Sequence, residues 1–316
     1  MKKKPLLILT GPTAVGKTAA SIKLAKAIDG EIISADTMQI YQYMNIGTAK
    51  ITPEEMAGVP HYLVDEITPD TPFHVYEFKK MAEEAMETIR SRGKIPIIAG
   101  GTGFYIQALL YDVDFCEEED EERSYRHELE QLAREKGSEH LHGILREVDP
   151  VSAEKIHPNN KKRVIRALEY FHETGTPISA HNFEQRQKES PYNFLYVVLT
   201  MERPRLYEQI NRRVDLMFQK GLLEEARNLL EMGCTSDMVS MQAIGYKELF
   251  PYFEGKISEE EAREQIKKDT RHFAKRQLTW FRRERDVTFL EKERFPDEDA
   301  VVSEILRLAK EKEILV

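Results

Sequence analysis

The stretch with the most specific chemistry lies near the amino terminus and reads Gly11-Pro12-Thr13-Ala14-Val15-Gly16-Lys17-Thr18. It fits the pattern G-x-x-x-x-G-K-[ST] without substitution, which is typical of a glycine-rich turn between a strand and a helix. In such a turn, backbone N–H groups and the positive end of the helix dipole converge on phosphate oxygens. The Lys17 side chain adds a positive charge, and the Thr18 hydroxyl is placed to hold Mg²⁺. The spacing predicts a polyphosphate site, without showing which bond in the ligand breaks.

The neighbouring segments supply the elements that such a loop requires. The apolar run Leu6-Leu7-Ile8-Leu9 precedes it and predicts a strand, and residues 18–28 are helical in character up to a stop at Asp29-Gly30. A strand before the loop and a helix after it are the context that distinguishes a phosphate loop from a chance glycine-rich turn.

The ends of the next two predicted strands carry further polar residues and glycines. Asp36 and Gln39 follow the apolar segment 31–35, and a Gly-Gly-Thr-Gly sequence at 100–103 follows the strand 94–99. Ligands of open parallel sheets bind at the carboxyl ends of strands, so we expect these groups to face the same crevice as Lys17. Two alternatives remain open, because Asp36 can be a simple turn cap and the glycines can serve a tight turn without a ligand.

The order of elements predicts an α/β fold, a P-loop NTPase-like parallel sheet flanked by helices, with an inserted helical domain. After an acidic run that begins at Glu117, the chain to about residue 190 is charged and helical, without a convincing strand. The segment 194–200 then resumes the sheet. We therefore predict a catalytic core formed by 1–115 and 191–316, and a helical insertion at 116–190.

Composition limits the class of protein. A net charge of −9 argues against a protein that coats nucleic acid indiscriminately, although an acidic chain can carry a local basic face. The two cysteines, Cys116 and Cys234, are far apart and have no metal-binding spacing, which indicates reduced thiols in a cytoplasmic protein. No apolar run approaches the length of a membrane span, so no membrane partner is expected.

Three helical segments concentrate positive charge. Residues 161–166 place four cations in six positions, and the predicted helix 205–217 bears Arg212 and Arg213, which either reach phosphates or are solvated. In the segment 271–285, cations alternate with aromatic residues, a combination suited to binding single-stranded RNA. The alternative for that segment is an amphipathic helix whose aromatic residues lie in the core and whose arginines lie on the surface.

Together, these motifs resemble those of the tRNA dimethylallyltransferase (tRNA isopentenyltransferase) family. The resemblance extends from about Leu6 to Phe289 and depends on the conjunction of the motifs. The segments that carry it are 11–18, 34–41, 45–50, 100–106, 156–160, 166–169 and 275–282, with Arg163. Thr37 and Tyr62 stand where the family more often has Ser and His, and Thr37 keeps the hydroxyl. A bacterial-type enzyme is expected, because the sequence lacks the carboxy-terminal zinc finger of eukaryotic relatives.

The resemblance implies transfer of the dimethylallyl (isopentenyl) group from dimethylallyl diphosphate to N6 of the adenosine immediately 3′ of the tRNA anticodon, position 37. Diphosphate is released, so the loop holds a leaving group rather than a nucleotide attacked at phosphorus. The residues implied to bind the diphosphate are Gly11, Thr13, Ala14, Val15, Gly16, Lys17 and Thr18. Mg²⁺ is the implied cofactor, held by Thr18.

The resemblance also implies that Asp36, Thr102 and Lys17 are catalytic. The exocyclic amine of adenine is conjugated with its ring and barely basic, so a carboxylate must accept its proton as the N–C bond forms. Asp36 matches the base of the family, Thr102 a residue near the transferred group or the adenine, and Gln39 a residue that contacts the base.

The tRNA anticodon stem-loop is the implied macromolecular partner, contacted by the core and by the insertion at 116–190. The residues implied to bind it are Asp36, Thr37, Met38, Gln39, Thr102, Arg126, Lys162, Arg163, Arg166, Gln242, Gly245, Lys247, Lys275 and Arg276. We expect a cytoplasmic monomer.

Three other functions remain open on sequence alone. A small-molecule or nucleoside phosphate kinase would use the same loop to bind ATP, but it leaves the late basic segment 271–285 without a role. Prenyl transfer to free adenine nucleotides leaves the basic patches of the insertion unexplained. A non-catalytic RNA-binding module would be favoured by loss of Asp36 or Lys17, and both are present.

Overall fold

A computed structural model of the chain describes residues 3–113 and 120–315. Its internal contacts form two compact units, Met1–Leu110 with Pro191–Val316, and Tyr111–Ser190. The boundary predicted between residues 115 and 116 lies outside the described residues, as do Cys116 and the start of the acidic run. Each unit is described separately below.

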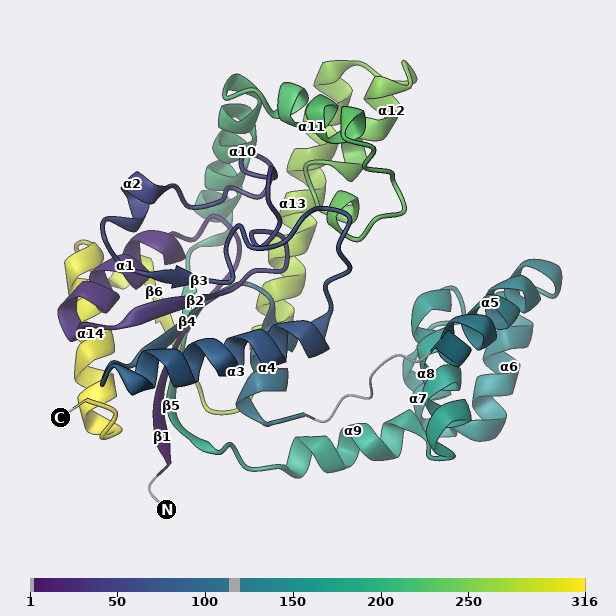
Figure 1. Cartoon of the computed structure of the whole chain (residues 1–316), viewed down its shortest axis with the longest axis horizontal. Helices are drawn as coiled ribbons and strands as arrows, with labels where there is room; N and C mark the ends of the chain where they lie inside the picture. Colours follow the sequence, from purple (N-terminus) through teal and green to yellow (C-terminus); the bar gives the residue numbers. More distant parts are fainter. Residues whose placement is uncertain (1–2, 114–119, 316) are drawn as a thin grey trace. The chain divides into compact units, whose positions relative to one another are not determined.

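The first unit is built on a parallel sheet that, within the described residues, has six strands in the order β3-β2-β4-β1-β5-β6 (Figure 1). The strands are β1 Lys4–Thr10, β2 Glu31–Ala35, β3 His61–Tyr62, β4 Pro96–Gly100, β5 Tyr192–Thr200 and β6 Val287–Glu291. The register places Gly100 beside both Thr10 and Ala35, so that β1, β2 and β4 end at the same edge. The predicted α/β fold is confirmed.

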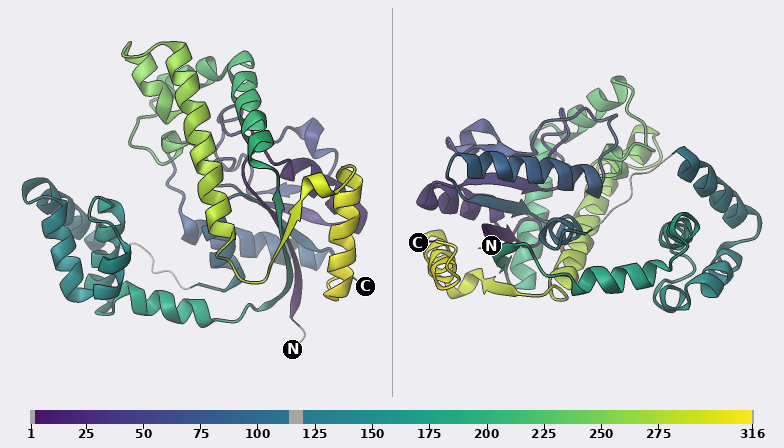
Figure 2. Two further views of the ribbon diagram at one scale, coloured as in Figure 1. Left: turned by 180° about the vertical axis from the view of Figure 1, so that it is seen from behind. Right: turned by 60° about the horizontal axis from the view of Figure 1, so that its bottom comes forward.

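The first unit also contains α-helices. They are α1 Lys17–Ile28, α2 Pro53–Met56, α3 Val75–Ser91, α4 Gly103–Leu110, α10 Arg203–Gln219, α11 Leu222–Glu231, α12 Phe250–Phe253, α13 Glu259–Phe281 and α14 Glu298–Glu311. Alternate residues such as Leu7, Leu9 and Val197 form one buried cluster with side chains of α1, α10, α13 and α14. Helices α10 and α13 run side by side in all views (Figures 1 and 2).

Helix α13 has two chemically different sides. It begins at a capping box in which the Ser258 side chain accepts the N–H of Glu261, and the Glu261 carboxylate accepts the N–H of Ser258. Its buried residues are Ala262, Ile266, Ala274, Gln277 and Phe281. Most of these are apolar and recur at helical spacing, so they fix which side faces the sheet and leave the cations on the other side.

The second unit is helical, and its described residues include no strand. Its helices are α5 Asp120–Glu135, α6 Ser138–Val148, α7 Pro150–Lys155, α8 Lys161–Thr174 and α9 Ile178–Gln187. They share a core of their own, which contains Leu129, Leu141, Leu145, Val164 and Leu168. A separate core allows this unit to be considered a structural entity by itself.

One buried carboxylate joins two helices of the second unit. Asp149 is 1% exposed and accepts the backbone N–H and the hydroxyl of both Ser152 and Ser179, at 2.6–2.9 Å. It thereby caps α7 and holds the start of α9.

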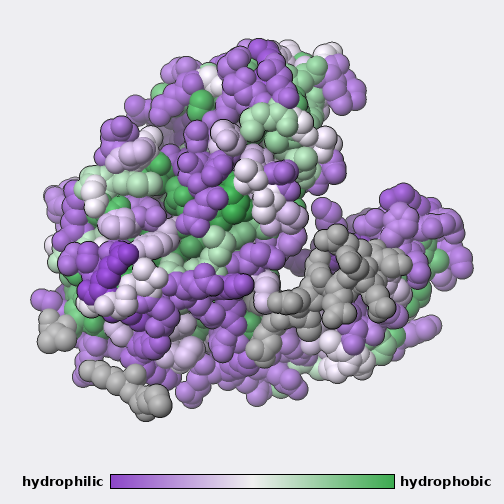
Figure 3. All heavy atoms as spheres, in the orientation of Figure 1, coloured by the Kyte–Doolittle hydropathy of each residue, from purple (hydrophilic) through white to green (hydrophobic). Residues whose placement is uncertain are grey.

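The surface seen in Figure 3 is predominantly hydrophilic, with hydrophobic residues exposed only in patches. Among residues 3–113 and 120–315, no helix combines the length and the apolar character that crossing a membrane requires.

Replacement of Asp149 by Ala is expected to lower the free energy of unfolding of the second unit by about 3 kcal/mol, since it leaves buried donors without an acceptor. The measurement is hydrogen exchange of the peptides that cover α7 and α9 in the full chain. Glu154→Ala, an exposed change on the same helix, is the control. Unchanged protection in Asp149→Ala would show that this carboxylate does not hold the unit together.

Candidate active site

The phosphate loop joins β1 to α1 in the predicted strand–loop–helix order. Gly11 and Gly16 have φ values of 148° and 93°, which favour glycine, and Ala14 is also left-handed at 64°. A Cβ atom on Gly11 would lie 2.4 Å from the carbonyl oxygen of Leu199. Gly11 is therefore required both by its backbone conformation and by the close approach of β5.

Lys17 folds over this loop. Its ammonium group donates to the carbonyl oxygens of Gly11 and Pro12, at 3.0 and 2.9 Å. Burial lowers the pKa of Lys17 to about 8; the charge of Arg213 lowers it as well, whereas Asp36 raises it. The three side chains therefore lie close enough to influence one another.

Arg213 of α10 supplies a second cation at the loop. Its guanidinium donates to the Thr13 hydroxyl at 3.2 Å. Burial lowers the pKa of Arg213, whereas the charges of Asp36 and Glu55 raise it. Sequence analysis left Arg212 and Arg213 undecided between phosphate contact and solvent, and the structure separates them, since only Arg213 reaches the loop.

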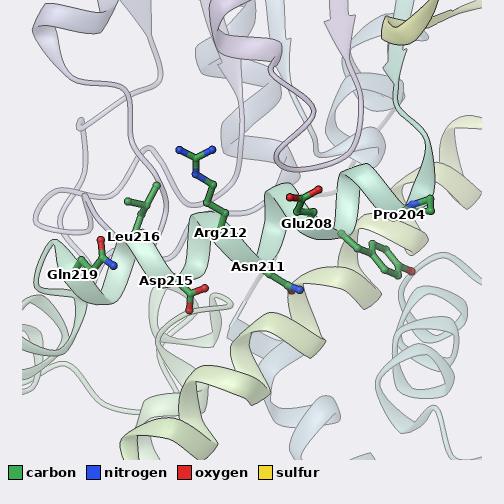
Figure 4. Close-up of a pocket in the computed structure, with 8 residues that line it drawn as sticks. Pro204, Glu208, Asn211, Arg212, Asp215, Leu216 and Gln219 are labelled. Carbon is green, nitrogen blue, oxygen red and sulfur yellow. The ribbon is translucent and has the colours of Figure 1, made fainter.

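Arg212 lines a groove of about 610 Å³ along α10, shown in Figure 4. It projects from the helix away from Asn211 and Asp215, which pair with Arg271 and Lys267 of α13 at 2.6 and 2.8 Å. None of the predicted site residues lines this groove.

Asp36 follows β2 at the same edge of the sheet. Its Oδ1 atom accepts the N–H of Met38 at 3.0 Å, so the turn-cap interpretation of Asp36 is correct as far as this oxygen is concerned. Within the described part of the chain, no hydrogen bond reaches Oδ2. The carboxylate therefore caps a turn with one oxygen and keeps the other available as a proton acceptor.

Thr102 is adjacent to Asp36 through the backbone. Its N–H donates to the carbonyl oxygen of Ala35 at 3.1 Å, and its own carbonyl accepts the N–H groups of Tyr105 and Ile106 at the start of α4. This places Thr102 beside Asp36, at the ends of neighbouring strands β4 and β2.

The glycines around Thr102 are explained by contacts within the protein. A Cβ atom on Gly100 would lie 2.3 Å from the backbone of Ala35, and one on Gly103 would lie 2.2 Å from the Trp280 ring. Similarly, a Cβ atom on Gly101 would lie 2.3 Å from the amide nitrogen of Gln277. These glycines thus accommodate neighbouring chain segments, which favours the tight-turn alternative over close approach of a ligand.

Glu225 of α11 links residues 45–47, which belong to a segment that carries the family resemblance, to the 242–247 segment, which is implied to contact tRNA. Its carboxylate accepts the backbone N–H groups of residues 45–47 at 2.8–3.0 Å and the Tyr246 hydroxyl at 2.6 Å. Residues 48 and 49 in turn lie 3.4 Å from the amide nitrogen of Gln39 through their carbonyl oxygens. In the 242–247 segment, Gln242 and Lys247 are exposed, whereas Gly245 is buried.

The exposed side of α13 and the two residues that follow the helix form a basic stripe, which we define as Lys268, His272, Lys275, Arg276, Arg282 and Arg283. None of these residues makes an ion pair within the described ranges. Phe281 is buried on the opposite side, and Phe273 lies beneath the guanidinium of Arg276 at 5.7 Å. The segment is therefore amphipathic, with Phe281 in the core and its cations facing solvent. Binding of RNA by these cations stays a prediction.

The cations of the second unit differ in availability. Lys162 and Arg163 at the start of α8 are exposed, whereas Arg166 lies 3.9 Å from Glu173. Arg126 pairs with the buried carboxylate of Glu169 through two hydrogen bonds of 2.6 and 3.0 Å. Arg126 is therefore engaged in holding α5 to α8.

The predicted Mg²⁺ ligand is accessible. Thr18 lies exposed in the first turn of α1, and its hydroxyl makes no hydrogen bond within the described chain. A single hydroxyl beside a phosphate loop fits Mg²⁺, which usually takes most of its ligands from phosphate and water. No cluster of three or more His, Cys, Asp or Glu side chains suited to a metal occurs among the described residues.

Comparison with known proteins identifies the family. A family model described as IPP transferase matches residues 39–284. The chain belongs to the IPP transferase family. It is 58% identical to a tRNA dimethylallyltransferase of Lachnoclostridium phytofermentans over 99% of both chains. A second relative of that name, from Acetivibrio thermocellus, is 49% identical over 95% of this chain and 96% of its own.

Solved structures give the same result for this IPP transferase. A tRNA isopentenylpyrophosphate transferase from Bacillus halodurans matches with a TM-score of 0.74 and 44% identity, over 98% of this chain and 97% of its own. A eukaryotic dimethylallyltransferase acting on tRNA matches with a TM-score of 0.77 and 29% identity, over 91% of this chain and 74% of its own.

Sequence analysis assigned no role to two side chains that link distant segments, Gln277 and Glu225, although Gln277 lies within the segment 275–282 that carries the family resemblance. Each acts on segments far away in the chain. Gln277 stands among exposed cations in the sequence, and only its position on the buried side of α13 distinguishes it.

The pKa of Lys17 predicts a pH dependence for binding of inorganic diphosphate by this IPP transferase. Affinity is expected to fall about fivefold between pH 8 and pH 9, because the charged fraction of a group with a pKa of about 8 falls by that factor. Titration calorimetry across this range measures it. Lys17→Arg, which remains charged, isolates the effect from the titration of diphosphate itself. The prediction fails if both proteins show the same profile.

Proposed function

We propose that this protein transfers the dimethylallyl group from dimethylallyl diphosphate to N6 of the adenosine immediately 3′ of the anticodon in tRNA, and releases diphosphate. The observation that carries the proposal is the position of the Asp36 carboxylate beside a phosphate loop with two cations, Lys17 and Arg213. The loop and its cations can bind an anionic leaving group, and the carboxylate can accept the proton released by the attacking amine. The names of the relatives agree with this reaction.

The loop stabilises the leaving group. As the bond between the allylic carbon and oxygen breaks, its electron pair leaves with diphosphate, and negative charge accumulates on the phosphate oxygens. The N-terminus of α1, Lys17 and Arg213 are all positive there before the reaction starts, so no reorganisation is needed. We assign diphosphate binding to Gly11 and Thr13–Thr18, and extend the predicted set by Arg213.

Asp36 accepts the proton. The N6 lone pair forms the bond to the allylic carbon, and the N6 proton passes to Oδ2, the oxygen that the Met38 N–H leaves free. Thr102, held against Ala35, faces the same edge and orients the adenine or the transferred group. Neutral adenine amine and anionic carboxylate thus become a secondary amine and a carboxylic acid.

We also propose that Mg²⁺ assists this reaction. The Thr18 hydroxyl would hold it together with oxygens of the diphosphate, and its charge would lower the energy of the departing diphosphate. The proposal is supported by the exposed Thr18 hydroxyl at the loop, which makes no hydrogen bond to the described residues.

The basic stripe of α13 supports tRNA as the acceptor. Consecutive cations on one helix side follow a phosphate backbone, and α8 presents Lys162 and Arg163 in the second unit. We propose contacts to the anticodon stem-loop from these residues, from Gln242 and Lys247, and from segment 36–39. A phosphate kinase gives this stripe no role. We further propose that the protein acts in the cytoplasm as a monomer.

The reaction is tested with unmodified tRNA, Mg²⁺ and dimethylallyl diphosphate labelled in the allyl group. Label on one adenosine next to the anticodon, with stoichiometric diphosphate, is the expected result. A chelator in a parallel tube tests Mg²⁺, and ATP in another tests the kinase. Conversion of ATP to ADP without label on tRNA would exclude the proposed function.

Asp36→Asn is expected to lower turnover at least ~10²-fold, while tRNA affinity stays within about threefold, because the amide retains an acceptor for the Met38 N–H but not a base. Single-turnover transfer and filter binding measure the two quantities. Asp36→Ala, which also loses the cap, is the comparison for damage to the turn. Wild-type turnover in Asp36→Asn would show that another group takes the proton.

Replacement of Lys275 and Arg276 together by Gln is expected to weaken tRNA binding and to reduce the slope of log K against log salt by about 1–2, as phosphate contacts are lost. Arg307→Gln with Lys310→Gln removes the same charge from α14 and serves as control. A similar slope for both double variants would mean that the stripe is ordinary surface.

A further inference from the structure

The buried side of α13 carries one polar side chain that is 6% exposed, Gln277. We propose that Gln277 is a positioning residue: it locks the phosphate loop to the turn that presents Thr102, and so sets the distance between the leaving group and the acceptor. The inference rests on the proposed function, since it concerns the alignment of those two groups.

The side chain bridges two loops that are far apart in the sequence. Its Oε1 atom accepts the N–H of Thr13 at 2.9 Å, and its Nε2 atom donates to the carbonyl oxygen of Gly101 at 2.9 Å. Because one partner is a donor and the other an acceptor, only a single orientation of the amide satisfies both. The bridge is therefore directional, and neither Glu nor an apolar side chain can reproduce it.

Both ends of the bridge lie next to groups with a proposed role. Thr13 is held at two points, its N–H by Gln277 and its hydroxyl by Arg213. Gly101 directly precedes Thr102, whose N–H is bound to Ala35 beside Asp36. A shift of the amide would thus move the phosphate loop relative to Thr102 and Asp36. A displacement of about 1 Å between reacting groups can lower a reaction rate by about 10²-fold.

The Gln277 bridge also requires glycine at position 101. A Cβ atom on Gly101 would lie 2.3 Å from Nε2 of Gln277, so alanine there displaces the amide. Gly101 has no positive φ value, and its need for glycine therefore arises from this contact rather than from the backbone. The two positions should act as one unit when they are changed.

The test measures two substrates separately. Gln277→Ala is expected to raise the KM for dimethylallyl diphosphate and the Kd for inorganic diphosphate about tenfold each, and to lower kcat, because a buried hydrogen bond to the loop is lost. The Kd for tRNA is expected to stay within about twofold, since the basic stripe lies on the other side of α13. Gln277→Glu, which keeps the Thr13 acceptor but places a charge near diphosphate, should bind diphosphate less well than Gln277→Ala.

Further variants test whether Gln277 and Gly101 act as a pair. Gly101→Ala should reproduce the effect of Gln277→Ala, and the double variant should be no worse than either, as expected for residues that act as a pair. Gln265→Ala is the matched control, because Gln265 lies on the same helix and donates to Asp269 at 2.8 Å on the exposed side.

The outcomes separate this inference from the function. Absence of transfer by the wild-type protein refutes the function, whereas diphosphate binding can still be measured by calorimetry without tRNA. A lowered melting temperature of Gln277→Ala with unchanged KM and diphosphate Kd would reduce Gln277 to a structural residue. Additive losses in the double variant would equally overturn the proposed pair.

Discussion

The parallel register of β1, β2 and β4 is the constraint on which the site depends. Gly100 lies beside Thr10 on one strand and Ala35 on another, so three loops leave the sheet at one level. The phosphate loop, Asp36 and Thr102 then come together without any long connection. A shift of one residue in a strand would turn its side chains to the other face and separate them.

Electrostatics at this edge is unbalanced in favour of an anion. Lys17 and Arg213 both lie partly buried near the loop, and burial together with mutual repulsion lowers the pKa of Lys17. The carbonyl oxygens of Gly11 and Pro12 and the charge of Asp36 offset only part of this cost. A bound diphosphate would supply the missing negative charge, so substrate binding and relief of this repulsion are the same event.

Helix α13 connects the two proposed substrates through its two sides. Its buried side places Gln277 between the phosphate loop and the Gly101 carbonyl, while its exposed side carries the basic stripe. Trp280 on the same helix fills the space over Gly103. Helix α13 therefore contributes both to the reaction site and to the surface that we assign to tRNA.

The sequence by itself determined the α/β fold, the family and the phosphate loop, because these depend on local patterns: strand, glycine turn, helix, and charges at fixed spacing. It also showed Asp36 and Thr102 at strand ends. Only the tertiary structure decided that Arg213 rather than Arg212 meets the loop, that the glycines at 100–103 make room for protein, and that Gln277 and Glu225 hold distant segments. The physical reason is that such contacts join residues far apart in the chain, and no spacing rule encodes which side chain meets which.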